Sequence, residues 1–180
     1  YREQEKVLSY LNGLQEDILL NINDFKESDA SDEQTSILQL FRREKGGMLN
    51  KYKVNLIVDN SATKGVPVKV EYNPTYNGLF GSLEYENKLG TMVTDFTMIK
   101  PGIIHQANGG YLILQAKDIL TTPFMWESLK RVLKTKTISL ESIRDQLGLL
   151  TASSLKPEPI PVDVKVILIG SEQLYQLLYQ

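Results

Sequence analysis

The first 27 residues place apolar side chains on one face of a helix. Six of them recur at steps of three and four residues: Val7, Leu11, Leu14, Ile18, Ile22 and Phe25. Glu and Gln fill much of the opposite face. This period predicts a long amphipathic helix over residues 1–27 that packs on its own protein or on a partner helix. The stripe spans too few heptads to predict a committed coiled coil.

The helical pattern stops after residue 25. Residues 26–36 (KESDASDEQTS) are acidic, small and poor in apolar side chains, which is typical of a loop or a disordered linker. Residues 36–45 (SILQLFRREK) predict a short helix that ends at the Gly46–Gly47 pair. We therefore expect residues 1–50 to form a helical element with an acidic linker.

From residue 51 onward the apolar positions follow strand patterns. Strands are predicted at 52–59, 66–72, 111–115, 137–141 and 164–170, a β-hairpin at 82–99, and helices at 126–133 and after Ser171. This alternation of strands and helices predicts an α/β domain with a parallel sheet over residues 51–180. Because residues 111–114 and 164–169 are continuous apolar runs, we expect them to be neighbouring parallel strands at the centre of that sheet.

Composition and charge exclude several classes of protein. The 180 residues carry 20 Lys and Arg against 22 Asp and Glu, and with this net charge of −2 no nucleic-acid partner is expected. No apolar run is long enough to span a membrane, and the first residues show no secretory leader, so no membrane partner is expected. The chain has no cysteine and one histidine, which excludes disulfides, thiolate zinc sites and a cysteine nucleophile. These features favour a cytoplasmic location.

Complete catalytic motifs are absent from the sequence. It contains no GxxxxGK[ST] phosphate loop, no GxSxG, no HExxH and no EF-hand loop. A Ser–Lys dyad is not excluded, because both residue types are common, but no pair stands out. Helical patterns run to both ends of the chain, so we interpret it as a fragment of a larger protein. We expect no catalytic residue and no metal site in this fragment.

The most informative segment is HQANGGYLILQAKDIL, residues 105–120. A Gly–Gly pair leads into an apolar strand that ends at polar residues, which is the layout of a strand that presents acids to Mg²⁺ and nucleotide. The segment resembles the Walker B region of AAA+ proteins, in particular the Lon-like proteases, whose pattern is close to HxANGGxLxxDExxxL. The resemblance extends over about residues 50–180, through NPTYNGLFG, the hairpin, WESLKRVL and SLKPEPIPVDVKVILIG. Residues 1–27 resemble the tail of this subfamily's helical insertion.

This resemblance implies a fold and an activity. The fold would be a partial AAA+ (P-loop NTPase-like) α/β domain, with helices on both faces of a parallel sheet, an inserted β-hairpin and an N-terminal long helix. The parent would be a hexameric, ATP-dependent Lon-type endopeptidase whose ring feeds protein substrates to a Ser–Lys serine protease domain. ATP and Mg²⁺ would be cofactors of the full-length protein. Without a Walker A loop or the proteolytic domain, we expect this fragment alone to be inactive and to hold no cofactor.

Four residues mark where the sequence meets or leaves the family pattern. Gln115 and Ala116 stand where the Walker B Asp–Glu pair is expected. A neutral amide cannot anchor Mg²⁺ through its waters, and a methyl group cannot polarise water. Asp118 is two residues further on and is interpreted as a helix N-cap. Ser171 occupies the sensor-1 position, where it either contacts phosphate or caps the final helix.

The hairpin is the candidate substrate-binding element. The resemblance implies a loop that faces the pore of the ring and grips polypeptide through Tyr85, Met92 and Phe96, while the alternative is a hairpin packed on its own domain. His105, Asn108 and Trp126 are interpreted as structural residues. The basic side chains of the helix at 126–133 and just beyond it are interpreted as a solvated face, rather than as a surface for nucleic acid or a neighbouring subunit: Lys130, Arg131, Lys134 and Lys136.

Three functional classes remain open. The module is a working motor whose nucleotide is bound mainly by groups outside the chain, or a degenerate, non-hydrolysing AAA+ scaffold of an ATP-independent Lon-like peptidase. Gln115 and Ala116 favour the scaffold. A DNA-remodelling AAA+ relative is the third class, and the near-neutral charge argues against it.

Overall fold

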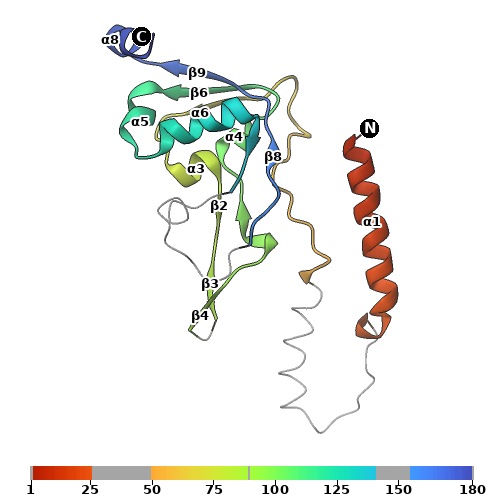
Figure 1. Ribbon diagram of the computed structural model, residues 1–180. Coiled ribbons are helices and arrows are strands. Elements are labelled where there is room, and N and C mark those ends of the chain that lie inside the picture. The colour runs from red at the N-terminus through yellow and green to blue at the C-terminus, as the bar shows by residue number, and fades with distance from the viewer. Residues whose placement is uncertain (1, 26–49, 89, 141–154, 180) are drawn as a thin grey trace. The chain divides into compact units, whose positions relative to one another are not determined.

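The computed structural model describes residues 2–25, 50–88, 90–140 and 155–179 (Figure 1). The chain divides into two compact units, Tyr1–Val54 and Asn55–Gln180, each of which is described by itself. The acidic linker and the helix predicted at 36–45 lie outside the described residues. No helix in the described ranges is both long enough and apolar enough to cross a lipid bilayer.

The first unit is built on the predicted long helix. Helix α1 covers Arg2–Leu20 and is followed by a short 3-10 helix, η1, at Ile22–Phe25. The long helix ends before residue 27. At this end the Asp17 carbonyl accepts both the Asn21 N–H at 3.0 Å and the Asn21 side-chain amide at 2.8 Å, and the chain continues as η1. The helix of the sequence prediction is confirmed, and its C-terminal end is shorter than predicted.

Asp17 gathers the polar contacts of this first unit. Its carboxylate lies 2.8 Å from the Lys51 ammonium and accepts a 2.6 Å hydrogen bond from the Tyr52 hydroxyl. These two partners hold the pKa of Asp17 below its ordinary value, the hydrogen bond from Lys51 contributing most. The Phe25 and Tyr52 rings are 5.3 Å apart. The end of α1 is thereby joined to residues 51–52.

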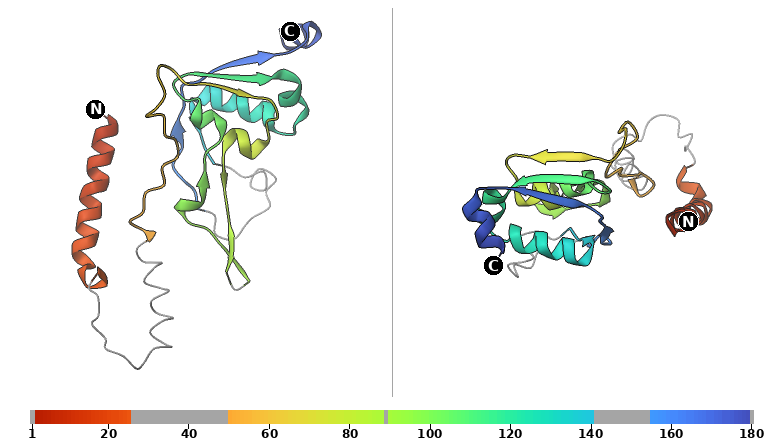
Figure 2. Two further views of the ribbon diagram at one scale, coloured as in Figure 1. Left: turned by 180° about the vertical axis from the view of Figure 1, so that it is seen from behind. Right: turned by 90° about the horizontal axis from the view of Figure 1, so that it is seen from above.

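The second unit is organised by a three-stranded parallel sheet. Strands β1 (Val68–Glu71), β6 (Tyr111–Gln115) and β9 (Lys165–Ile169) pair in the order β1-β6-β9 (Figures 1 and 2). The prediction that residues 111–114 and 164–169 are neighbouring parallel strands is confirmed, with Ile113 opposite Ile167. Strand β6 is central, and β9 forms one edge of the described sheet.

Four helices pack with the sheet to form the core. They are α3 (Tyr76–Phe80), α4 (Ile103–Gln106), α5 (Ala116–Thr121) and α6 (Met125–Thr135). The largest fully buried side chains come from these helices, from β6 and from the short strand β7 (Thr137–Ile138): Leu79, Ile104, Leu112, Leu114, Ile119, Met125, Leu129 and Ile138. A further helix, α8 (Glu172–Tyr179), follows β9. The α/β class and the parallel sheet are therefore confirmed.

The face of the sheet that points away from these four helices is exposed, whereas the sequence predicts helices on both faces. Alternate residues of the edge strands are 43% to 56% exposed there: Val68, Val70, Ile167 and Ile169. Among the described residues, α3, α4, α5 and α6 lie on the opposite side (Figures 1 and 2). Continuous apolar runs predict that helices cover both faces of the sheet, but the described part of the chain places these helices on one face only.

The predicted hairpin is present and has two separate ladders. Strand β2 (Ser82–Leu83) pairs with β5 (Ile99–Lys100), and β3 (Glu86–Lys88) pairs with β4 (Thr91–Val93). A short 3-10 helix, η2 (Phe96–Met98), lies on the return arm. The β3–β4 end projects away from the sheet and its helices (Figure 1).

Two further predicted strands have different outcomes. Residues 137–141 contribute the short strand β7 (Thr137–Ile138), which pairs with β8 (Ile160–Pro161). The strand predicted at 52–59 is wrong, because this segment runs as irregular structure and pairs with no strand among the described residues. Val54 and Leu56 are 79% and 68% exposed, so the alternating apolar residues there do not mark a packed strand face.

The Gly–Gly pair before β6 permits a close approach of backbones. Gly109 has φ +80°, which favours glycine, and a Cβ on Gly110 would lie 1.9 Å from the Pro67 carbonyl oxygen. The same Pro67 oxygen accepts the Tyr111 N–H at 2.9 Å. A side chain at position 110 would therefore push β6 away from the segment that leads into β1.

Asn108 and His105 hold this turn, as the sequence predicts for structural residues. The Asn108 amide donates to the Pro161 carbonyl at 3.0 Å and accepts the Asp163 N–H at 2.7 Å. His105 is 4% exposed, and its Nδ1 accepts the Gly102 N–H at 3.0 Å, which only an unprotonated nitrogen can do. Burial lowers the pKa of His105 below its usual 6.5.

Gly110→Ala should cost more stability than Gly109→Ala. Alanine at 109 meets open space and adds only the strain of a positive φ, about 1–2 kcal/mol. Alanine at 110 meets a backbone carbonyl, so we expect a loss of roughly 3 kcal/mol or more. Urea unfolding followed by circular dichroism measures both variants. Equal losses would show that β6 tolerates displacement from Pro67.

The stability of the second unit should fall as the pH falls through the titration of His105. Its folded pKa is lowered, so its contribution is complete above the unfolded pKa of about 6.5 and is lost as the pH drops through the folded pKa. Because the chain has one histidine, NMR titration of its imidazole protons is unambiguous. We expect a midpoint below 6.5, and a melting temperature that depends less on pH between 5 and 7 in His105→Gln. A midpoint at or above 6.5 would contradict the buried, neutral ring.

Candidate functional site

The carboxyl ends of β6 and β9 lie side by side at one end of the sheet, which we call the carboxyl edge. Gln115 lies opposite Ile169 in the ladder, so Ala116 follows one strand end where Gly170 and Ser171 follow the other. The structure therefore brings Gln115, Ala116 and Ser171 to the same edge. In open α/β sheets this is the edge at which ligands bind.

Ala116 is packed into this edge and does not project from it. It is the first residue of α5 and is 3% exposed. A Cβ built on Gly170 would lie 3.2 Å from the Ala116 Cβ and 3.5 Å from a methyl group of Leu174. The position where the resemblance places a carboxylate is thus an apolar contact between β6, β9 and the start of α8.

Gln115 and Asp118 occupy the start of α5. Gln115 is the N-cap residue, but its side chain makes no capping hydrogen bond. The prediction that Asp118 is the N-cap is wrong, because α5 begins two residues earlier, at Ala116, and Asp118 lies in its first turn. There the carboxylate is favourably placed for the helix dipole, and the Asp118 carbonyl accepts the Thr122 hydroxyl at 2.8 Å.

Ser171 caps the final helix, one of the two roles predicted for it. Its hydroxyl oxygen accepts the Leu174 N–H at 3.4 Å, and its carbonyl accepts the Tyr175 N–H at 3.1 Å. Ser171 is exposed at the edge. A sensor-1 role toward nucleotide stays a prediction.

Glu71 is a carboxylate at this edge that the sequence analysis missed. It is the last residue of β1 and lies opposite Leu114. Its carboxylate accepts the Asn73 N–H at 2.9 Å. The sequence does show that Glu71 ends an apolar strand. Assigning it to the carboxyl edge, however, required knowing that β1 pairs with β6.

The edge does not fit the Mg²⁺–nucleotide site of a working AAA+ motor. An amide and a buried methyl group replace the acid pair at Gln115 and Ala116. Within the described ranges, no three His, Cys, Asp or Glu side chains gather as metal ligands. Mg²⁺ needs carboxylate oxygens beside the phosphates, and we assign no step to it here.

The hairpin separates its three candidate contact residues. Met92 lies on β4 in the projecting end and is 61% exposed. Tyr85 and Phe96 lie between the two ladders and are only half-buried, so they are not fully open to solvent. The role of these three residues as substrate contacts stays a prediction, with Met92 the most accessible of them.

The basic set on and beyond α6 faces solvent. Lys130, Arg131, Lys134 and Lys136 are exposed, which agrees with a solvated helix face. The Lys130 ammonium lies 2.7 Å from the Glu127 carboxylate and 5.5 Å from the centre of the Trp126 ring. Trp126 is partly buried against the core, as predicted.

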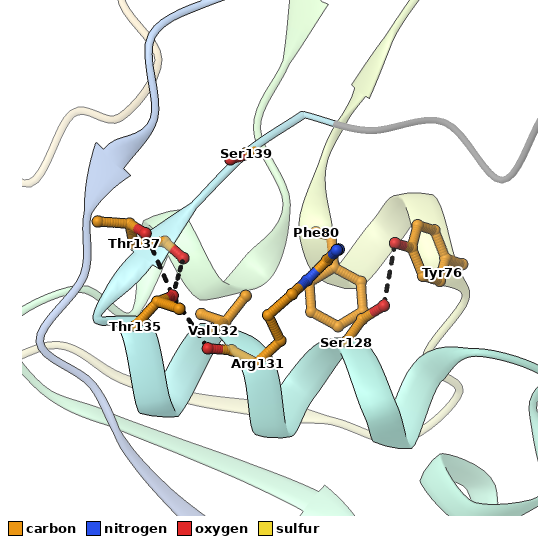
Figure 3. Close-up of a pocket in the computed structure, with 8 residues that line it drawn as sticks. All are labelled: Tyr76, Phe80, Ser128, Arg131, Val132, Thr135, Thr137 and Ser139. Atoms are coloured by element: carbon orange, nitrogen blue, oxygen red, sulfur yellow. Dashed lines mark hydrogen bonds between the residues drawn. The ribbon is translucent and has the colours of Figure 1, made fainter. Parts of the chain in front are cut away.

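A small hollow of about 120 Å³ lies between α3, α6 and β7 (Figure 3). Hydroxyl groups dominate its polar lining, beside one guanidinium and two apolar side chains: Tyr76, Phe80, Ser128, Arg131, Val132, Thr135, Thr137 and Ser139. The Tyr76 and Ser128 hydroxyls are 3.2 Å apart and join α3 to α6. Its lining includes no carboxylate and no imidazole, the side chains that most often bind metals or act as general bases.

A larger hollow of about 320 Å³ lies at the opposite, amino-terminal end of β6. Its lining is half apolar: Ile57, Val58, Asn60, His105, Asn108 and Ile160. The Asn108 amide and His105 Nδ1 already bond within the turn. This hollow belongs to the turn that precedes β6, away from the carboxyl edge.

Comparison with known proteins agrees with this geometry. The chain is 31% identical over 100 residues to a protein of Escherichia coli K12 named "Putative Lon protease homolog", covering 53% of this chain and 14% of that protein. It is 32% identical over 116 residues to the protein of the same name from Haemophilus influenzae Rd, covering 63% of this chain and 17% of that protein. The chain thus spans less than a fifth of either relative.

A family description covers most of the second unit. Residues 64–180 match the sequence model of the LonB-like AAA domain, a range that holds the three-stranded sheet, the hairpin and the carboxyl edge. These are the parts on which the resemblance in the sequence rests. The chain belongs to the LonB-like AAA domain family.

Proposed function

We propose that this chain is the polypeptide-handling segment of the AAA+ module of a Lon-like, ATP-dependent serine protease. In the longer protein, copies assemble as a ring, with a hexamer as the expected size, in the cytoplasm. The hairpin contacts unfolded polypeptide and delivers it to a proteolytic Ser–Lys domain outside this chain. Because Gln115 and Ala116 do not fit Mg²⁺, ATP and Mg²⁺ would be bound in the longer protein mainly by groups outside this chain.

The observation that carries this proposal is the projecting hairpin. Its β3–β4 end stands clear of the core (Figure 1). Met92, on β4, presents a long, flexible and exposed apolar side chain. A methionine can contact many different sequences, because its thioether adapts to irregular surfaces. A contact of this kind suits a protein that must handle polypeptides without regard to sequence.

The uncovered sheet face supports assembly with further protein. Val68 and Val70 on β1 and Ile167 and Ile169 on β9 expose apolar surface on a parallel sheet, a type of sheet that is almost always covered on both faces. Exposed apolar side chains on two strands of one parallel sheet are typical of a face that another part of a protein covers. A ring, or the remainder of the longer protein, supplies such a partner.

A second candidate function is favoured by the carboxyl edge. The buried Ala116 and the neutral Gln115 fit a non-hydrolysing AAA+ scaffold that assembles the ring and admits substrate to an ATP-independent peptidase. A DNA-remodelling role has less support, because the net charge is −2 and neither relative is named for it. The two remaining candidates share the hairpin and differ in the use of nucleotide.

Met92→Asp in the longer protein tests the role of the hairpin. We expect degradation of unfolded casein to slow by about tenfold, since a charged side chain loses the apolar contact, a loss of about 1.4 kcal/mol. Cleavage of a short fluorogenic peptide, which reaches the protease by diffusion, should stay unchanged. Met92→Leu is the matched control and should retain both activities. Equal effects of Met92→Asp on casein and peptide would contradict substrate gripping by the hairpin.

Ala116→Glu tests the carboxyl edge in this chain. A carboxylate at a position with 3% exposure should cost about 3 kcal/mol or more, while Lys117→Glu at the exposed neighbouring position should change stability by less than about 0.5 kcal/mol. Denaturant unfolding gives both values. If Ala116→Glu is tolerated and calorimetry detects Mg²⁺-dependent ATP binding, the edge is open and the scaffold candidate loses its support.

A further inference from the structure

The two ladders of the hairpin are separated by arms of unequal length. Between the pair Leu83–Ile99 and the pair Glu86–Val93, the outgoing arm has two residues, 84–85, and the return arm has five, 94–98. The return arm therefore carries three extra residues, and these form the η2 turn. Extra residues of this kind bend a hairpin and redirect the strands beyond them. The direction of the β3–β4 end thus depends on how this turn is held.

Hydrogen bonds within the hairpin hold one side of the turn. The Asp95 carboxylate accepts the Thr97 N–H at 2.8 Å and caps η2. The Glu84 N–H donates to the Met98 carbonyl at 3.0 Å, and the Thr94 hydroxyl donates to the Glu84 carbonyl at 2.7 Å. These bonds join the two arms. The Phe96 carbonyl also accepts the Ile99 N–H, so within the turn it is left with one lone pair for a partner outside the hairpin.

Asn55 supplies those partners from outside the hairpin. Its side-chain nitrogen donates to the Phe96 carbonyl at 2.8 Å and to the Ile99 carbonyl at 3.0 Å. These acceptors are 41 and 44 residues away in the sequence and stand at the start of η2 and just after its end. Both amide protons of one side chain are thereby used to span the extra turn.

We propose that Asn55 is a positioning residue for the hairpin. By spanning η2, its amide fixes the bend between the β2–β5 ladder and the β3–β4 ladder, and so fixes the direction in which Met92 is presented. The geometric part of this inference stands on the hydrogen bonds alone. Its consequence for polypeptide handling rests on the proposed function.

The surroundings of Asn55 point to this role over a role in core packing. Its neighbours Val54 and Leu56 are 79% and 68% exposed, and in the part of the chain that the structure describes the segment pairs with no strand. Asn55 itself is half-buried, and none of the core side chains comes from residues 52–60. Loss of its amide should therefore release the hairpin without opening the core.

The absence of cysteine from the chain allows a direct test by spin labelling. Positions 92, at the hairpin end, and 117, on α5, are both exposed, so spin labels can be attached after Met92→Cys and Lys117→Cys. Pulsed electron–electron double resonance then gives the distribution of distances between the two labels. We expect one narrow distribution with Asn55 present. Asn55→Asp keeps the side-chain shape but removes both donors, so it should broaden or shift the distribution. Asn77→Asp, an exposed change on α3, is the matched control and should leave it narrow.

Two further measurements separate positioning from general stability. Amide exchange in residues 86–93 should quicken by about tenfold in Asn55→Asp, while exchange in β6 stays unchanged and the melting temperature moves by less than about 3 °C. An unchanged distance distribution and unchanged exchange in the hairpin would overturn the inference. A general loss of protection that includes β6 would also overturn it, because Asn55 would then support the core.

Activity of the longer protein distinguishes this inference from the function on which it depends. If Asn55→Asp broadens the distance distribution and slows casein degradation about as much as Met92→Asp, both the positioning role of Asn55 and the gripping role of the hairpin are supported. If the distances broaden but casein degradation is unchanged, Asn55 positions the hairpin and the gripping function fails. If the distances do not change, the positioning inference fails whatever the degradation rate.

Discussion

The close approach of Gly110 to Pro67 is the contact on which the second unit depends. It allows the Tyr111 N–H to reach the Pro67 carbonyl and so sets β6 beside β1 from its first residue. Directly before it, Asn108 bonds to Pro161 and Asp163, in the segment that leads into β9. One turn thus fixes the central strand between its two neighbours. The Ala-Asn-Gly-Gly sequence has a physical reason at its last three positions: a side-chain bridge, a positive φ and the absence of a Cβ.

The opposite end of the same strand shows a different use of small residues. At the carboxyl edge, Ala116 and Gly170 let β6, β9 and the start of α8 close on one another. An edge that holds nucleotide needs charge and room, whereas this edge is neutral at Gln115 and apolar at Ala116. The fold of the AAA+ family is retained here, while the chemistry expected at its strand ends is not visible in these residues. The hairpin, by contrast, exposes Met92 near its end and is bonded to Asn55 at its bend.

The pattern of apolar residues along the chain was sufficient to predict the two strands that are continuous apolar runs. Residues 111–114 and 164–169 could be assigned as neighbouring parallel strands because both are apolar runs with few polar interruptions. Alternation alone misled at 52–59, where nothing in the sequence shows that Val54 and Leu56 stay exposed. The start of α5 was misplaced because Asp118 is a good capping residue, but the strand gives way to helix earlier, at Gln115.

The supporting contacts of the candidate site could not be predicted in the same way. Asn55 reaches carbonyl groups 41 and 44 residues away, and backbone acceptors leave no trace in the side-chain pattern. Glu71 joins the carboxyl edge only because β1 pairs with β6. The closeness of Ala116 to Gly170 depends on the register of β6 and β9, which composition and period do not determine.

The central claim, that the projecting hairpin contacts unfolded polypeptide, is tested most directly by photo-crosslinking in the longer protein. A benzophenone amino acid placed at position 92 should crosslink to casein during degradation, and the same group at position 117 on α5 should not. Crosslinking at 117 that equals crosslinking at 92, or none at 92 while casein is being degraded, would contradict the account.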